Sequence, residues 1–275
     1  MKHWFITGVS RGFGFALAKA ALARGDKVVG TVRGEAPNLP HKQGQLCILK
    51  VDLADEQRVV NAVEQAFAAF GRIDVIVNNA GYGVLGAVES STDGDLRDLF
   101  NVNVFTPIRI VRAALPYLRE QGSGYILNIT SIAGRAPGVG SALYAATKYA
   151  LEGFSTALAP EVAPLGIKVT AVAPGQFRTD FLSENSVRKQ DDQAAAYAST
   201  VGAALESLVR LNHNQLGDPD LAASCLIDLV NAQEPPLNLL LGSDALERAH
   251  RKMDAMLAEM QAWAGMSLST DFKQN

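Results

Sequence analysis

Residues 4–14, WFITGVSRGFG, decide the fold of this chain. The apolar start predicts a buried strand, and residues 13–24 have the periodicity of a helix. Glycines between them permit a tight turn and a close approach of the backbone to a ligand, while the N-terminus of the helix offers free N–H groups to an anion. This strand–turn–helix context is typical of dinucleotide binding, and a tight turn without a ligand is the alternative.

The rest of the chain alternates short apolar runs with longer helical patterns. Strands are predicted at residues 4–7, 27–32, 46–51, 73–77, 125–129, 167–172 and 237–241, the last of which is also compatible with a buried helix start. Helices are predicted at residues 13–24, 56–70, 93–121 and 143–165. The strands are continuous apolar runs, as in parallel sheets that are covered on both faces. The order predicts an α/β fold with a doubly wound parallel sheet, a Rossmann fold in a single domain over residues 1–275.

The pattern is less regular towards the C-terminus. Residues 182–218 are more polar, with an Ala-rich helical stretch at 192–211, and we interpret them as a substrate lid. Residues 244–263 predict an amphipathic helical tail packed on the body. Its apolar positions are Leu246, Met253, Met256, Leu257, Met260 and Trp263. Such a stripe is more typical of a core or a subunit interface than of a cofactor site.

Composition and charge argue against several classes of function. The net charge is −3 and the basic residues are scattered, so we expect neither nucleic acid nor a membrane surface as a partner. The N-terminus lacks the apolar region of a signal peptide, and no apolar run reaches transmembrane length, which favours a cytoplasmic protein. Cys47 and Cys225 are expected to be buried free thiols. The four histidines are dispersed, so no metal site is expected.

A second motif, Tyr144-Ala-Ala-Thr-Lys148, carries the candidate chemistry. On a helix the two side chains share one face, one turn apart, and Ser131 precedes them in Asn-Ile-Thr-Ser. Holding a free phenolate at neutral pH costs about 4 kcal/mol, which a neighbouring ammonium and a hydrogen bond would largely offset. A tyrosine with such neighbours exchanges protons with an alcohol or a carbonyl. The alternative is a helical Tyr and Lys that are four residues apart by coincidence.

The end of the second predicted strand bears on the choice of cofactor. An NAD-binding protein of this fold normally carries an acidic residue there, but this chain has Arg33. Together with Arg11 in the glycine turn, Arg33 would flank the 2′-phosphate of NADP. Two solvated surface arginines are the alternative, and Glu35 would reach the ribose and favour NAD. On balance we favour NADP over NAD.

These motifs resemble the short-chain dehydrogenase/reductase family, in its compact single-domain branch, over most of residues 3–180. The body of the chain is similar to members described as 17β-hydroxysteroid-dehydrogenase-like. The resemblance implies a catalytic tetrad of Asn103, Ser131, Tyr144 and Lys148. The cofactor-binding residues implied by the motifs are Gly8, Ser10, Arg11, Gly12, Phe13, Gly14, Arg33, Asp52, Leu53, Asn79, Ala80, Gly81, Tyr144, Lys148, Pro174, Gly175 and Thr179.

The resemblance also implies hydride transfer between a nicotinamide and a ketone or secondary alcohol. Tyr144 would donate the proton, Ser131 would bind the carbonyl oxygen, and Lys148 would lower the pKa of Tyr144 and hold the nicotinamide ribose. Asn103 would position a water that resupplies the proton. An apolar pocket for a small-molecule substrate would be lined by Tyr82, Val139, Leu143, Phe177 and Phe181.

Two other functions are compatible with this fold. A regulatory or scaffold protein would bind the nicotinamide without turnover, but such a protein is expected to lack the tyrosine or the lysine. An enzyme acting on sugar nucleotides would need a larger C-terminal domain than this chain provides. Members of the family commonly pair through long helices such as 93–121 and 143–165, which implies a homodimer or homotetramer.

Overall fold

Seven strands form one parallel sheet at the centre of the molecule. The computed structural model describes residues 1–182, 187–189, 195–212 and 214–272. The strands are β1 (His3–Ile6), β2 (Lys27–Val32), β3 (Leu46–Lys50), β4 (Val75–Asn78), β6 (Gly124–Ile129), β7 (Ile167–Pro174) and β9 (Asn238–Leu241). Their order, β3-β2-β1-β4-β6-β7-β9, reverses its direction between β1 and β4. This confirms the predicted doubly wound α/β fold in a single domain, and ligands of such sheets bind at the reversal, beyond the carboxyl ends of the strands.

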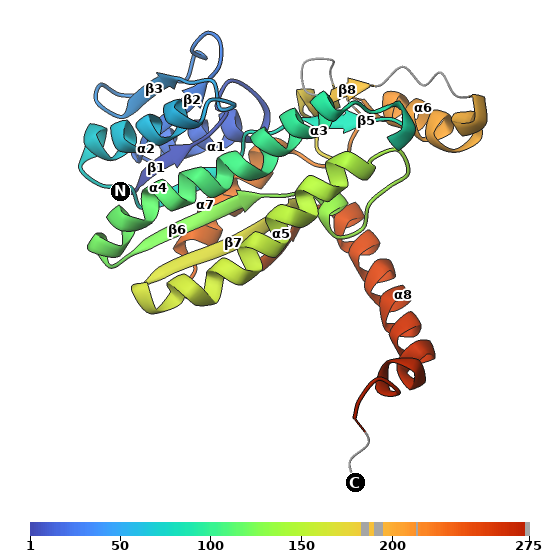
Figure 1. Ribbon diagram of the computed structural model, residues 1–275. Helices are drawn as coiled ribbons and strands as arrows, with labels where there is room; N and C mark the ends of the chain where they lie inside the picture. Colours follow the sequence, from blue (N-terminus) through green and yellow to red (C-terminus); the bar gives the residue numbers. More distant parts are fainter. Residues whose placement is uncertain (183–186, 190–194, 213, 273–275) are drawn as a thin grey trace.

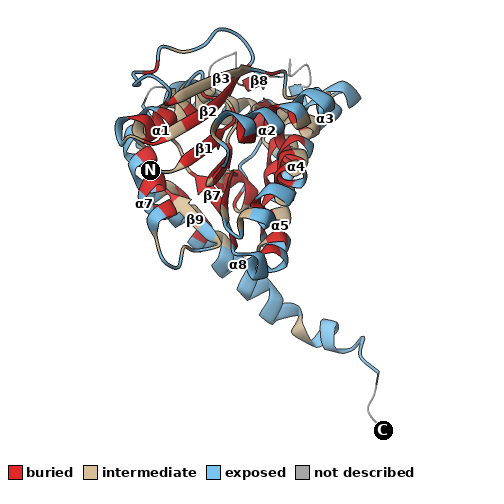
Figure 2. Ribbon diagram, turned by 90° about the vertical axis from the view of Figure 1, so that its left-hand side faces the viewer, coloured by how far each residue is buried: buried red, intermediate tan, exposed pale blue. Residues whose placement is uncertain are grey.

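Helices cover both faces of the sheet (Figures 1 and 2). They are α1 (Gly12–Ala23), α2 (Glu56–Phe70), α3 (Asp93–Phe100), α4 (Thr106–Gln121), α5 (Ala142–Val162), α6 (Ala203–Leu211), α7 (Pro219–Asn231) and α8 (Ser243–Leu268). One core lies beneath α1 and α7, and the other beneath α2, α4 and α5. Within β1, Trp4 and Ile6 belong to the first core and Phe5 to the second. Because alternate residues fill two cores, apolar residues follow one another along the strands instead of alternating with polar ones.

The helix predicted at residues 93–121 is interrupted. A single π-helical turn, Asn101–Phe105, separates α3 from α4. The hydroxyl of Thr106 lies 3.0 Å from the Asn101 carbonyl oxygen at this turn. Hydrophobic periodicity does not detect one inserted residue, and such turns occur frequently at functional sites. The turn carries Asn103, one of the predicted site residues.

The segment after β7 contains elements that the sequence did not predict. A second, two-stranded parallel sheet joins β5 (Gly83–Leu85) to β8 (Val187–Lys189). Of the helix predicted at 192–211, residues 192–194 lie outside the described residues, and the α-helical part is α6 alone. The prediction also missed α7, although its start has a typical signal: Asp218 caps the first turn and a proline follows it.

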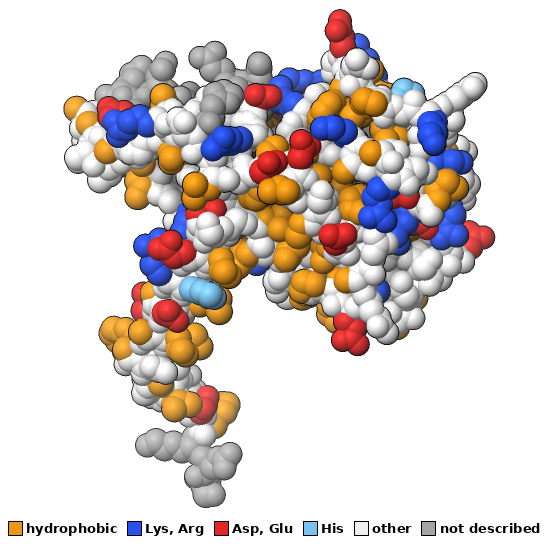
Figure 3. Space-filling view, turned by 180° about the vertical axis from the view of Figure 1, so that it is seen from behind, with side chains coloured by type: hydrophobic (Ala, Val, Ile, Leu, Met, Phe, Trp, Pro, Cys, Tyr) orange, Lys and Arg blue, Asp and Glu red, His pale blue; other side chains and the backbone are white. Residues whose placement is uncertain are grey.

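Helix α8 is confirmed as a helix, but its predicted packing on the body is wrong. Only Ala245 and Ala249 are buried, and the helix extends away from the sheet after them (Figure 1). Trp263 is 61% exposed, and Figure 3 shows apolar side chains along the projecting part. None of the described helices combines the length and the apolar character needed to cross a membrane. The two cysteines are free, Cys47 half-buried and Cys225 exposed, so the predicted burial of Cys225 is also wrong.

Candidate active site

The glycine turn between β1 and α1 has the shape that a bound phosphate requires. Gly8 and Gly12 adopt positive φ angles of 73° and 59°. A Cβ atom on Gly14 would lie 2.2 Å from the Gly8 carbonyl oxygen, so only glycine fits there. The Asn79 side-chain amide donates hydrogen bonds to the carbonyl oxygens of Thr7 (2.8 Å) and Gly8 (3.1 Å). The loop after β4 therefore fixes the turn from the other side of the sheet reversal.

The N-terminus of α1 is open to an anion. Within the described part of the chain no side chain caps this helix, and its first turn contains no acidic residue. Its first N–H groups therefore retain their capacity to bind phosphate oxygens, and the helix dipole adds to the attraction. The glycine turn borders a cavity of about 690 Å³.

Most of the predicted cofactor-binding residues meet at this cavity. Its lining includes Gly8, Ser10, Arg11, Gly12, Phe13, Asn79, Ala80, Gly81, Tyr144, Lys148, Pro174, Gly175 and Thr179. Four predicted residues are not part of the lining: Gly14, Arg33, Asp52 and Leu53. Gly14 packs behind the glycine turn, whereas Arg33 and Asp52 are exposed where the chain leaves β2 and β3. Because the strands are parallel, these last two residues share the carboxyl edge of the sheet with the cavity.

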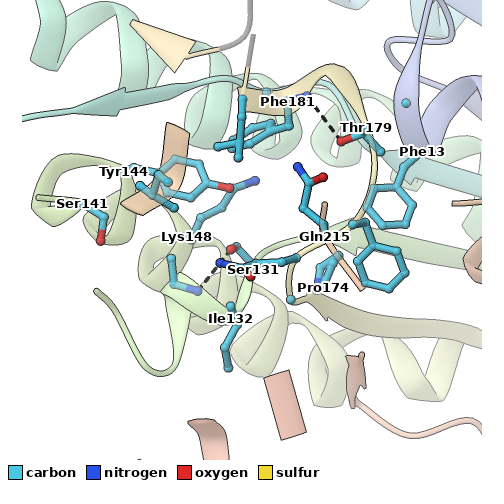
Figure 4. A pocket seen from close by; sticks show the side chains of 18 of the residues that line it. Phe13, Ser131, Ile132, Ser141, Tyr144, Lys148, Pro174, Thr179, Phe181 and Gln215 are labelled. Atoms are coloured by element: carbon cyan, nitrogen blue, oxygen red, sulfur yellow. Dashed lines mark hydrogen bonds between the residues drawn. The ribbon is translucent and has the colours of Figure 1, made fainter. Parts of the chain in front are cut away.

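Three of the predicted catalytic side chains come together on one wall of the cavity (Figure 4). Ser131 follows β6, and its hydroxyl lies close enough to the phenol of Tyr144 on α5 to favour the phenolate. Lys148, one turn further along α5, places its Nζ atom 5.6 Å from the centroid of the Tyr144 ring. The same Nζ atom donates a hydrogen bond of 3.0 Å to the Ile129 carbonyl oxygen at the end of β6. The arrangement can deliver a proton to an oxygen atom beside Ser131.

Burial sets the protonation states of this wall. It raises the pKa of Tyr144 to about 12, and the nearby Ser131 hydroxyl opposes this rise. The expected lowering of the Tyr144 pKa is therefore wrong for this structure, because removing the phenolate from water outweighs its polar neighbours. Burial also lowers the pKa of Lys148 to about 8, against the attraction of Glu152. At neutral pH the phenol carries its proton and the amine its charge.

Asn103 lies beside this wall and does not line the cavity. It is 1% exposed, and its amide donates to the Tyr82 carbonyl oxygen (2.8 Å) and the Thr147 hydroxyl (3.1 Å). Its side-chain oxygen accepts a hydrogen bond from the Tyr82 backbone N–H (3.1 Å). A Cβ atom on Gly81 would lie 3.0 Å from this oxygen and 3.7 Å from the Lys148 amine. Asn103 thus fixes the backbone beside Lys148, and its role with a water molecule stays a prediction.

A charged cluster beneath the wall was not predicted. The Glu152 carboxylate, which is buried, accepts a hydrogen bond from Thr130 (2.5 Å) and forms an ion pair with Arg135 (3.0 Å). Glu152 follows Tyr144 and Lys148 at the same four-residue spacing, which is the signal that the sequence offered. Since Thr130 directly precedes Ser131, Glu152 links the serine to the helix that carries the tyrosine.

The remaining lining of the cavity is mainly apolar. Of the predicted substrate-pocket residues, Val139, Phe177 and Phe181 belong to it, and Tyr82 and Leu143 do not. The predicted lid contributes Leu182, Ala204, Ser207, Leu208, Leu211 and Gln215. Gln215 and Arg248 were not predicted, because no local pattern marks them. Across the described residues, His, Cys, Asp and Glu form no group of three that could hold a metal ion.

Comparison with known proteins identifies the family. A model of the short chain dehydrogenase family matches residues 2–190. The chain belongs to the short-chain dehydrogenase family. It is therefore an oxidoreductase, and the resemblance seen in its motifs is confirmed, whereas no comparison tests the 17β-hydroxysteroid-dehydrogenase-like subtype.

Two relatives in this family cover most of the chain. An "Oxidoreductase BOA17" from Botryotinia fuckeliana is 39% identical over 273 residues, which is 98% of this chain and 99% of the relative. A "3-ketodihydrosphingosine reductase" from Bacteroides thetaiotaomicron is 35% identical over 237 residues, 86% of both chains. The similarity to these two relatives extends well beyond the glycine turn and includes the segment after β7.

Solved structures of the family share the architecture. A short-chain dehydrogenase from Streptomyces avermitilis has a TM-score of 0.88 and 39% identity, covering 98% of this chain and all of that one. "ElxO with NADP Bound" has a TM-score of 0.74 and 27% identity, covering 90% and 100%. A 3-ketoacyl-(acyl-carrier-protein) reductase from Brucella melitensis, complexed with NADH, has a TM-score of 0.71 and 26% identity, covering 87% and 96%. Of these three structures, one therefore holds NADP and another NADH.

Proposed function

We propose that this enzyme reduces the carbonyl group of a ketone with an apolar body, using NADPH. The observation that carries the proposal is the joint position of Ser131, Tyr144 and Lys148 on one wall of the cavity. A phenol that keeps its proton at neutral pH is suited to give that proton to a carbonyl oxygen. The Bacteroides relative is named as a reductase of a keto compound, which supports the same direction of reaction.

The residues present fit a dinucleotide. Gly8, Gly12 and the open N-terminus of α1 form a cradle for the pyrophosphate, and the cavity continues from this cradle to Tyr144. When bound, the nicotinamide supplies the hydride for the carbonyl carbon. Lys148 would hold the nicotinamide ribose through its free N–H groups, and Ser131 would orient the carbonyl oxygen towards the Tyr144 phenol.

The apolar lining is the basis for the substrate class. Val139, Phe181 and Leu208 would bury a hydrocarbon body, while Ser131 and Tyr144 provide the polar contacts for the carbonyl oxygen. Residues 182–218 would act as the lid over this body, because several of them line the cavity. We further propose that the enzyme is a homodimer or homotetramer in the cytoplasm.

A direct assay tests this function. NADPH consumption would be followed with a panel of straight-chain, aromatic and cyclic ketones, and NADH would be run in parallel. We expect turnover with apolar ketones and a higher kcat/KM with NADPH. NADPH binding without turnover of any ketone would instead favour a regulatory or scaffold protein.

The preference for NADPH rests on Arg33, which is exposed at the end of β2 where an acidic residue would favour NADH. We expect Arg33→Asp to reverse the preference, because the carboxylate would accept the ribose hydroxyls and repel a 2′-phosphate. Competition between NADPH and NADH, with Arg24→Asp at the end of α1 as a control, measures the change. An unaltered selectivity ratio in Arg33→Asp would remove Arg33 from this role.

A further inference from the structure

One polar side chain of the cavity has no part in the proposed proton transfer. Gln215 lies after α6, is only 3% exposed, and points its side-chain amide into the cavity (Figure 4). Its Oε1 atom is shielded from solvent and has no hydrogen-bond partner among the described residues. A buried acceptor without a partner destabilises the folded protein, so native proteins rarely keep one without a reason.

The backbone around Gln215 is fixed in place. The Arg178 guanidinium donates a hydrogen bond of 2.6 Å to the Gln215 carbonyl oxygen. Two backbone hydrogen bonds then join Gly217 to the segment after β7. The Arg178 N–H donates to the Gly217 carbonyl oxygen (2.9 Å), and the Gly217 N–H donates to the Gln176 carbonyl oxygen (3.0 Å). A Cβ atom on Gly217 would lie 2.4 Å from the Phe177 ring, so the two segments are in close contact. Gln215 is therefore held at the cavity by the segment after β7.

Among the described residues, no donor of the catalytic wall is hydrogen-bonded to the Gln215 Oε1 atom. Tyr144 has the Ser131 hydroxyl beside it, and Lys148 donates to the Ile129 carbonyl oxygen. The Thr179 hydroxyl, also in the cavity wall, accepts a hydrogen bond of 3.3 Å from the Phe181 backbone. A molecule that enters the cavity can bring the missing donor.

We propose that Gln215 is a ligand-recognition residue whose Oε1 atom accepts a hydrogen bond from an N–H or O–H group of the bound molecule. This inference rests on the proposed function, which offers two sources of such a donor. One is the carboxamide NH₂ group of the nicotinamide, and the other is a hydroxyl or amino group near the carbonyl of the substrate. Either group would donate to the Oε1 atom only when a molecule occupies the cavity.

Replacing Gln215 by methionine tests the proposal, because Met has a similar volume and cannot form this hydrogen bond. In the free protein we expect an unchanged or higher Tm, since an unpartnered acceptor is removed. NADPH, titrated alone by its fluorescence, is expected to bind about tenfold more weakly if the donor is the nicotinamide carboxamide.

Asn212 offers a matched control on the same segment. Its Oδ1 atom is also buried without a partner among the described residues, but Asn212 does not line the cavity. Asn212→Leu should therefore leave NADPH affinity unchanged. If this variant weakens NADPH binding as much as Gln215→Met does, the effect is not local recognition and the proposal is overturned.

A second arm identifies a substrate donor. The kcat/KM values for 1-hydroxy-2-decanone and 2-decanone would be compared in the wild type and in Gln215→Met. If Gln215 binds the substrate, the variant loses about tenfold on the hydroxyketone alone, with NADPH affinity unchanged. Equal kcat/KM ratios in the two proteins, together with unchanged NADPH affinity, would overturn the proposal, and so would a Tm that falls by several degrees without either effect. Failure of the proposed function itself would be visible separately, as a wild type that turns over neither ketone.

Discussion

Helices α5 and α8 are both long, with 21 and 26 residues, yet their surroundings differ in almost every respect. Helix α5 lies against the sheet and buries nine residues, among them Tyr144, Lys148 and Glu152. Helix α8 buries two alanines and carries its methionines and Trp263 in solvent. Both sequences are compatible with a helix, so the difference lies in what each helix packs against.

The contrast extends to charged pairs. On α5 the Glu152 side chain is 11% exposed and its partner Arg135 19%. On α8 the corresponding values for Glu247 and Arg251 are 69% and 70%. A buried carboxylate must keep its partners, because losing one leaves an uncompensated charge, whereas an exposed pair contributes about 1 kcal/mol or less. The candidate catalytic residues Tyr144 and Lys148 thus lie on the helix whose charged pair is buried.

The largest expected effect would come from the phenol on α5. We expect Tyr144→Phe to lower kcat by about 10²- to 10⁴-fold, because the proton donor is lost, while NADPH affinity stays close to the wild-type value. Tyr149→Phe is the control on the same helix. Tyr149 is 43% exposed and donates only to the Arg135 carbonyl oxygen (2.8 Å), so its loss should change kcat little. Near-normal turnover by Tyr144→Phe would show that the phenol on α5 is not the proton donor.

This part of α5 could be predicted from the sequence because the helix itself fixes the geometry. Residues four apart lie on one face, so Tyr144 and Lys148 had to be neighbours once the helix formed. The glycine turn was equally local, since its shape follows from the residues within it. Both predictions depend on backbone geometry over short distances.

The features that were predicted wrongly or not predicted at all depend on distant partners. The apolar stripe of α8 indicates a face, but nothing in its periodicity says what covers that face. The pairing of β5 with β8 joins three-residue strands about a hundred positions apart, too short for a pattern. Gln215 reaches the cavity only through contacts with the segment after β7, and the raised pKa of Tyr144 follows from burial that only the packed molecule shows.

The next largest effect would test the packing difference between the two helices. Leu151 on α5 is 1% exposed, and we expect Leu151→Ala to lower the free energy of unfolding by about 2–5 kcal/mol through the cavity it leaves. Leu257→Ala on α8, where the side chain is 54% exposed, should cost about 0.5 kcal/mol or less. Denaturant unfolding of both variants measures the two values. Similar losses would mean that α8 is packed in solution.

A smaller effect concerns the pH dependence set by Glu152. Burial lowers the pKa of Lys148 to about 8 and Glu152 opposes this, so the amine loses its proton as the pH rises through that value. Glu152→Gln removes the stabilising charge, and we expect the alkaline decline of kcat/KM to begin about one pH unit lower. The other groups facing Lys148 are the Tyr144 phenol and the Asn103 amide, and neither carries a charge at neutral pH.

Two variants separate charge from packing in that experiment. Thr130→Val removes the hydrogen bond to Glu152 without changing any charge, so it should lower the rate but leave the position of the alkaline decline unaltered. Glu247→Gln on α8 should change neither the rate nor the position of the alkaline decline, because its ion pair is exposed. If Glu152→Gln lowers kcat/KM by the same factor at every pH, Glu152 acts by positioning its neighbours and not through its charge.

The smallest expected effect lies at the outer end of α8. Trp263→Ser removes a large side chain that is 61% exposed and makes no contact with either core, so the Tm of a single copy of the chain should change by only about a degree. Measuring the Tm at several protein concentrations makes this the sharpest test of the contrast with α5. If a second copy covers the stripe in solution, the wild-type Tm rises with concentration and the variant loses that dependence. A wild-type Tm that is independent of concentration would instead mean that α8 stays exposed, and that the difference between the two helices persists in solution.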